Sequence, residues 1–166
     1  MKFTNPEEFF IKINQTYHLL LSGPLIIFVL LFLEKGESDW RIRIGGEYLK
    51  LFTVITPVLA ILLLVYAIVV TRKSNRNIDS TLNLKDKLIQ FNSHFKTEQF
   101  LFFLSGIVSM GGLYFTGSKF CIMSYLLVLF AASILRPSTD RLKKSLRLSK
   151  IQHEILLKKL SFDSEQ

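Results

Sequence analysis

The chain has 166 residues, of which 49% are hydrophobic and 20% are charged, and its formal net charge is +8. This length and composition fit one membrane domain, residues 1–166, and exclude a second folded domain. The single cysteine, Cys121, excludes an intramolecular disulfide and a cluster of thiol ligands on a metal, and we expect it to be a small buried hydrophobic residue.

Four apolar stretches predict membrane-spanning helices. The clearest is residues 51–71, LFTVITPVLAILLLVYAIVVT, which contains no charged side chain. A helix of this length covers about 30 Å at about 1.5 Å per residue, which is the thickness of the hydrocarbon layer. The other three stretches are residues 17–33, 100–115 and 120–135. The sequence therefore predicts an all-α membrane protein with four transmembrane helices.

The first two spans each contain an interruption. Ser22-Gly23-Pro24 breaks the first span and Thr56-Pro57 breaks the second, because proline removes a backbone hydrogen bond from a helix. We expect a kink at both places. Helix packing accounts for such kinks, and a break that admits a ligand is the alternative.

An amphipathic helix is predicted between the second and third spans. Its apolar stripe consists of Leu84, Leu88, Phe91 and Phe95, and its other face holds Lys85, Lys87 and Asn92. In the tail, Ser149 and Gln152 have the spacing of a capping box, so a helix is expected to begin there. The stripe can lie on the membrane or pack on the tail, and the alternative is that it docks onto another protein.

Small residues recur along the third span. Ser105, Ser109 and Gly112 fall on one helical face, where a neighbouring helix can approach closely. Only residues 116–119 separate the third span from the fourth, so these two spans are expected to form an antiparallel hairpin. The expected helix-packing residues are Ser22, Gly23, Ser105, Gly106, Ser109 and Gly112.

The two halves of the chain also match one another. Leu21-Ser22-Gly23 corresponds to Leu104-Ser105-Gly106, and the segment after the second span aligns without gaps with the segment after the fourth. This predicts two tandem helical hairpins of the same orientation, as a parallel repeat. The first repeat covers about residues 5–84 and the second about residues 85–148, with a cytoplasmic tail at residues 136–166.

The basic residues are distributed unevenly between the two sides of the predicted topology. Sixteen of the 21 Lys and Arg side chains fall on the side that holds both termini, and five fall on the other side. The positive-inside rule therefore predicts cytoplasmic termini. Anionic lipid headgroups are the expected partner of this charge, and nucleic acid is not, because no aromatic-rich basic surface or reading motif accompanies it.

The chain shows no sign of a catalytic centre. None of the four spans has an ionisable side chain at mid-depth, and His18 and Glu98 are expected to be solvated at the interface. P-loop, H-E-x-x-H and G-x-S-x-G motifs are absent from the sequence. We therefore expect no enzyme activity, no catalytic residues, no cofactor and no metal site.

The second half resembles a family of uncharacterised four-span membrane proteins of Bacteroidetes. The resemblance rests on residues 84–95 with Leu104-Ser105-Gly106, on Thr116-Gly117, and on Arg136-Pro137-Ser138 with Leu148-Ser149. It covers roughly the last 80 residues and, more weakly, residues 48–59. The resemblance implies a multi-pass protein of the bacterial inner membrane and brings no known activity.

Together these features predict a non-catalytic packing or scaffold subunit, in a homo-oligomer or in a larger membrane complex. The alternative is a small dimeric transporter or channel. Dry contacts between small residues would favour packing, whereas a polar cavity flanked by Ser22, Thr56 and Ser105 would favour transport.

Overall fold

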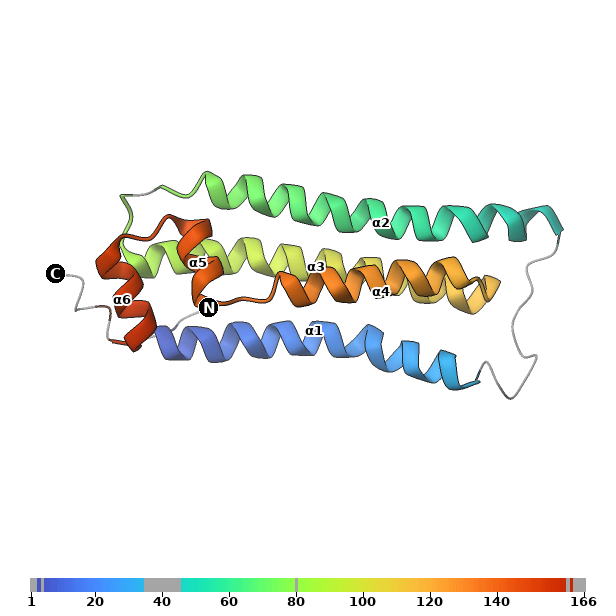
Figure 1. Ribbon diagram of the computed structural model, residues 1–166, viewed down its shortest axis with the longest axis horizontal. Helices are drawn as coiled ribbons and strands as arrows, with labels where there is room; N and C mark the ends of the chain where they lie inside the picture. The colour runs from blue at the N-terminus through green and yellow to red at the C-terminus, as the bar shows by residue number, and fades with distance from the viewer. Residues whose placement is uncertain (1–2, 4, 35–45, 80, 161, 163–166) are drawn as a thin grey trace.

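The computed structural model describes residues 3, 5–34, 46–79, 81–160 and 162, and in this part the chain forms six α-helices (Figure 1). Four long helices lie side by side, and two short helices lie at one end of the bundle, which we call the α5–α6 end. Residues 35–45, the first outer loop of the predicted topology, lie outside this description. The helices are α1 (Pro6–Glu34), α2 (Gly46–Arg76), α3 (Leu84–Thr116), α4 (Lys119–Ile134), α5 (Thr139–Leu146) and α6 (Lys150–Lys158).

Among the described residues, α1, α2 and α3 are each long and apolar enough to cross a membrane. The fourth predicted span corresponds to α4, which has 16 residues and therefore measures about 24 Å. It is followed after a short break by α5, and the two helices differ in direction by 82°. An all-helical chain with several apolar helices of membrane-spanning length is thus confirmed, and the fourth span stays a prediction.

The central helix of the bundle is α3, which packs against α1, α2 and α4, while α2 also packs against α4. The two helices that precede α3 in the chain, α1 and α2, lie on different sides of it and are not among the pairs in extensive contact (Figure 1). The tandem arrangement of two packed hairpins is therefore not confirmed. Instead, α1 and α2 each pack on α3, which presents Gly106 to α1 and presents Ser105 and Gly112 to α2.

The turn between α3 and α4 is short because its residues suit it. Gly117 ends α3 in the left-handed conformation, with φ of 63°, and its N–H donates to the carbonyl oxygen of Leu113 at 2.8 Å. Ser118 then caps α4 by accepting from the N–H of Phe120 at 3.2 Å. As a result, α3 and α4 pack as an antiparallel hairpin.

An apolar core fills the α5–α6 end. Phe9 and Ile13 of α1, Leu142 and Leu146 of α5, and Ile155 and Leu156 of α6 meet there around the stripe on α3. The four stripe residues, Leu84, Leu88, Phe91 and Phe95, are each 0% exposed. Ser149 and Gln152 form the predicted capping box at the start of α6, which confirms that expectation.

The interpretation of the stripe as a docking surface for another protein is therefore corrected. Its residues are covered by α1, α5 and α6 of the same chain, because the tail folds back over the start of α3. The polar face of this helix also needs correction, since Lys87 is 1% exposed and Asn92 is 6% exposed. Lys87 donates through Nζ to Oε1 of Gln152 at 3.0 Å, which ties α6 to α3.

Candidate functional site

Four small residues of α3, Ser105, Gly106, Ser109 and Gly112, form what we call the small-residue seam. The Ser105 hydroxyl donates to the carbonyl oxygen of Ala60 on α2 at 2.7 Å. The Ser109 hydroxyl shares a hydrogen bond of 3.0 Å with Ser124 on α4. Both serines are 0% exposed, and a buried hydroxyl is costly unless it is hydrogen-bonded. These bonds therefore satisfy the hydroxyls and join α3 to two neighbours.

The two glycines of the matched Leu-Ser-Gly triplets lie at the contact between α1 and α3. A Cβ atom on Gly106 would lie 3.1 Å from Cβ of Pro24, and one on Gly23 would lie 3.3 Å from the ring of Phe103. Both distances are tighter than ordinary carbon contacts, so the absence of side chains sets how closely these helices approach. Ser22 differs from its counterpart Ser105, because it is partly exposed and donates to the carbonyl oxygen of Leu19 in its own helix at 3.0 Å.

Gly112 lies where α2, α3 and α4 meet. A Cβ atom there would lie 2.5 Å from Oγ1 and 2.8 Å from Cβ of Thr56, and 2.8 Å from Sγ of Cys121. The Thr56 hydroxyl donates to the carbonyl oxygen of Phe52 at 2.7 Å, so it is satisfied within α2. Cys121 is free and buried, which confirms the expectation for the single thiol. Only glycine fits this junction.

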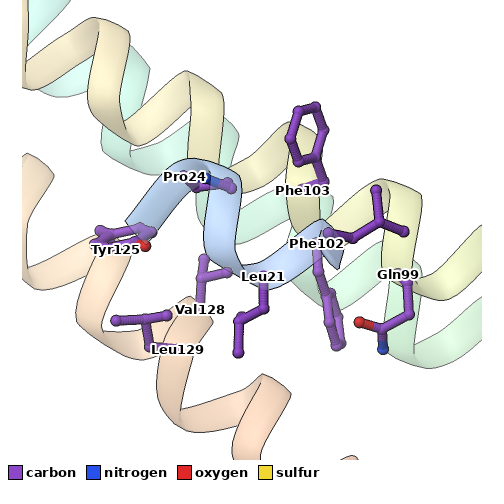
Figure 2. Close-up of a pocket in the computed structure, with 10 residues that line it drawn as sticks. Leu21, Pro24, Gln99, Phe102, Phe103, Tyr125, Val128 and Leu129 are labelled. Carbon is purple, nitrogen blue, oxygen red and sulfur yellow. The ribbon is translucent and has the colours of Figure 1, made fainter. Parts of the chain in front are cut away.

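A small crevice lies between α1, α3 and α4. Its volume of about 10 Å³ is about the space of one water molecule, which is far too small for a substrate. Within the described part of the chain, Nε2 of Gln99 and the hydroxyl of Tyr125 are buried without a hydrogen-bond partner. The wall includes Leu21 and Pro24 of α1, Gln99, Phe102 and Phe103 of α3, and Tyr125, Val128 and Leu129 of α4 (Figure 2).

A buried ion pair joins α3 to α5. Nη2 of Arg141 donates to both carboxylate oxygens of Glu98, at 2.9 Å and 2.7 Å, and Glu98 is 1% exposed. The expectation that Glu98 is solvated at the interface is therefore wrong. The carboxylate is buried because α5 turns back beside α3, and Arg141 supplies the compensating charge.

The sequence does not reveal this pair, because its members are 43 residues apart. A local signal nevertheless exists at the start of α5, where the Ser138 hydroxyl accepts from the N–H of Arg141 at 3.2 Å. A serine cap after Pro137 predicts a helix start, and a helix there places Arg141 in its first turn. Which acid it meets depends on the long-range fold.

No protein-family model, curated protein or solved structure matches this chain. The resemblance to Bacteroidetes membrane proteins therefore stays a prediction. Among the described residues, no group of three or more His, Cys, Asp or Glu side chains is placed to hold a metal ion. The candidate site is thus a set of helix contacts and one buried ion pair, and its arrangement is suited to holding helices together.

Proposed function

We propose that this protein is a non-catalytic integral membrane protein that acts through helix packing, in a homo-oligomer or as a subunit of a larger membrane complex. The observation that carries the proposal is the close, hydrogen-bonded contact along the small-residue seam. Ser105, Ser109 and Gly112 bring α2, α3 and α4 together with hydroxyl groups that are all hydrogen-bonded. These contacts hold the helices of one chain together as a unit, whose outward apolar faces can meet other subunits.

The hydroxyl groups that would line a transport path support the same choice. Ser22 donates to the carbonyl oxygen of Leu19, Thr56 to that of Phe52 and Ser105 to that of Ala60, at 3.0, 2.7 and 2.7 Å. A transported solute needs polar groups that are free to exchange partners along its route. Here each hydroxyl is bound to helix backbone, which favours packing over transport within one chain.

The outward faces of the long helices offer area for lipid or for other membrane subunits. Large apolar side chains are exposed along them, including Val54 at 62%, Leu62 at 60% and Phe130 at 66%. In a bilayer these surfaces are compatible with lipid, and association between subunits would rest on shape rather than on hydrophobic burial.

The proposed function predicts that the protein is associated with another subunit in its membrane. After cross-linking in native membranes and extraction in mild detergent, we expect a particle heavier than the 19.2 kDa chain, either a dimer or a complex with another subunit. Light scattering, corrected for bound detergent, measures the protein mass. A protein mass of 19.2 kDa with and without cross-linking, together with solute uptake by reconstituted vesicles, would contradict the proposal.

We further propose four spans in the bacterial inner membrane with both termini in the cytoplasm, supported by the distribution of basic residues. Tyr48 lies in the first turn of α2 and Ser93 in the third turn of α3, and these two helices begin at opposite ends of the bundle (Figure 1). Both residues are exposed, so they make a matched pair of labelling sites. Tyr48→Cys should react in intact cells with a membrane-impermeant thiol reagent, whereas Ser93→Cys should react only after the membrane is opened. The native thiol of Cys121 is buried and provides the blank. Reaction of Ser93→Cys but not Tyr48→Cys would reverse the topology.

A further inference from the structure

A second feature lies at the α5–α6 end, apart from the seam. A cavity of about 550 Å³ opens between the last turns of α2, the start of the apolar part of α3 and the α4–α5 connection. This volume is within the range of small-ligand pockets. We call it the basic cavity, because its charged lining residues are Arg72, Arg76, Arg141, Lys144, Arg147 and one acid, Glu98.

The positive charge of the basic cavity is not neutralised by the chain. Glu98 is already held by Arg141 through both of its oxygens. Among the residues that the structure describes, Arg72, Arg76, Lys144 and Arg147 have no ion-pair partner. In addition, Nη1 of Arg141 is buried and has no acceptor in that part of the chain. These four cations are exposed and surround one hollow, so an anion that binds in the hollow would meet several positive charges at once.

The depth of the cavity identifies where such an anion would come from. Arg72 directly follows the uncharged run 51–71, Ile134 is the last residue of α4, Leu135 is its C-cap, and all three line the cavity. Ile134 is 65% exposed, so one wall of the cavity continues into the apolar surface of the bundle. If the long helices span a bilayer, the cavity lies at the level of the phosphate groups of the lipids.

We propose that the basic cavity is a binding site for a phosphate group. Guanidinium groups present paired donors that match phosphate oxygens, and arginine supplies most of the cations here. The chemistry fits an anionic phospholipid headgroup, whose acyl chains would leave past Ile134, and it also fits a free phosphate from the aqueous phase. Ser145 and Asn75 also line the cavity.

The test uses two double variants with the same change in net charge on the same two helices. Arg76→Gln with Lys144→Gln removes two cations from the cavity. Lys73→Gln with Lys143→Gln removes the exposed neighbours of cavity residues, and neither Lys73 nor Lys143 lines the cavity. The full-length protein is reconstituted in phosphatidylcholine nanodiscs, and circular dichroism checks that each variant has the helix content of the wild type.

Two probes separate the sources of the phosphate. In one arm inorganic phosphate and pyrophosphate are titrated calorimetrically onto protein in phosphatidylcholine nanodiscs. In the other arm native mass spectrometry counts phosphatidylglycerol molecules that remain on protein taken from mixed phosphatidylcholine and phosphatidylglycerol discs. We expect the cavity variant to lose about tenfold or more in affinity or in retained lipid, and the control variant to change by less than about twofold. A cation that contacts the phosphate directly contributes a charged hydrogen bond, whereas the effect of a more distant surface charge is screened by salt.

Each outcome of these measurements either supports or overturns the proposal. Cavity-dependent retention of phosphatidylglycerol assigns the site to a lipid headgroup, and cavity-dependent binding of the free anions assigns it to a soluble phosphate. Equal losses in the two variants would show only a general attraction of surface charge, and no binding by the wild type in either arm would remove the site; both results overturn the proposal. A melting temperature of the wild type that rises with the bound probe, and does not rise in the cavity variant, gives a second readout that is independent of retention.

Discussion

Replacement of Gly112 by alanine is expected to destabilise the protein by about 1–3 kcal/mol, because the added Cβ overpacks a closed junction. That atom would lie 2.8 Å from Cβ of Thr56, which is fixed to the backbone of α2 and cannot rotate away. The helices must separate to accommodate it, and the melting temperature in detergent should fall by roughly 3–10 °C. Differential scanning fluorimetry of the purified protein measures this.

The neighbouring glycine provides the matched control. A Cβ on Gly111 would find no atom within 4 Å, so Gly111→Ala should leave the melting temperature unchanged or raise it slightly, since alanine favours a helix. Equal losses at the two positions would show that the effect comes from glycine in α3 in general. The claim that the seam sets the distance between α2, α3 and α4 would then fail.

Loss of Arg141 is expected to destabilise the protein strongly. Arg141→Gln removes the guanidinium group that donates to both oxygens of the buried Glu98 carboxylate, and breaking a buried pair in this way costs about 3–5 kcal/mol. The melting temperature should fall by roughly 10 °C or more. Because α5 and α6 would lose one of their attachments to α3, limited proteolysis should also cut the tail more rapidly.

The double variant Glu98→Gln with Arg141→Gln separates the pair from its individual residues. Two neutral side chains leave no buried charge, so most of the lost stability should return. Lys143→Gln, an exposed neighbour on α5, should change stability by less than about 0.5 kcal/mol. If the double variant were as unstable as Arg141→Gln alone, the cost would not lie in an uncompensated carboxylate, and the ion-pair account would be wrong.

Local sequence patterns predict much of the fold. The long apolar runs predict the apolar parts of α1, α2 and α3, because length and the absence of charge suffice to define such helices. The amphipathic helix predicted between the second and third spans is not separate, because it is the first part of the continuous helix α3. The capping box of Ser149 and Gln152 is equally local and is present. The recurrence of Ser105, Ser109 and Gly112 marked a helix face, and the structure places all three in contact with α2 or α4.

Long-range contacts could not be predicted from the sequence, since no local pattern encodes them. Lys87 and Glu98 look like solvated residues in sequence, and both become buried when the tail folds over α3 and supplies Gln152 and Arg141. The pairing of helices also departs from chain order: α1 and α2 are neighbours in sequence, but each packs on α3. The basic cavity likewise combines residues of α2, α3 and α5. Its cations lie far apart in the sequence, where no local pattern indicates that they form one site.

The most direct test of the packing account uses the native thiol and needs no substitution. Cys121 is 0% exposed and lies beside Gly112 and Thr56 at the junction of α2, α3 and α4. In intact membranes, a small charged methanethiosulfonate reagent carried by water should leave Cys121 unmodified, and the thiol should react fully once the protein is unfolded in dodecyl sulfate. Mass spectrometry of the whole chain counts the modification. Rapid modification in the native membrane would mean that a water-filled path reaches the seam, and it would contradict the packing account in favour of transport.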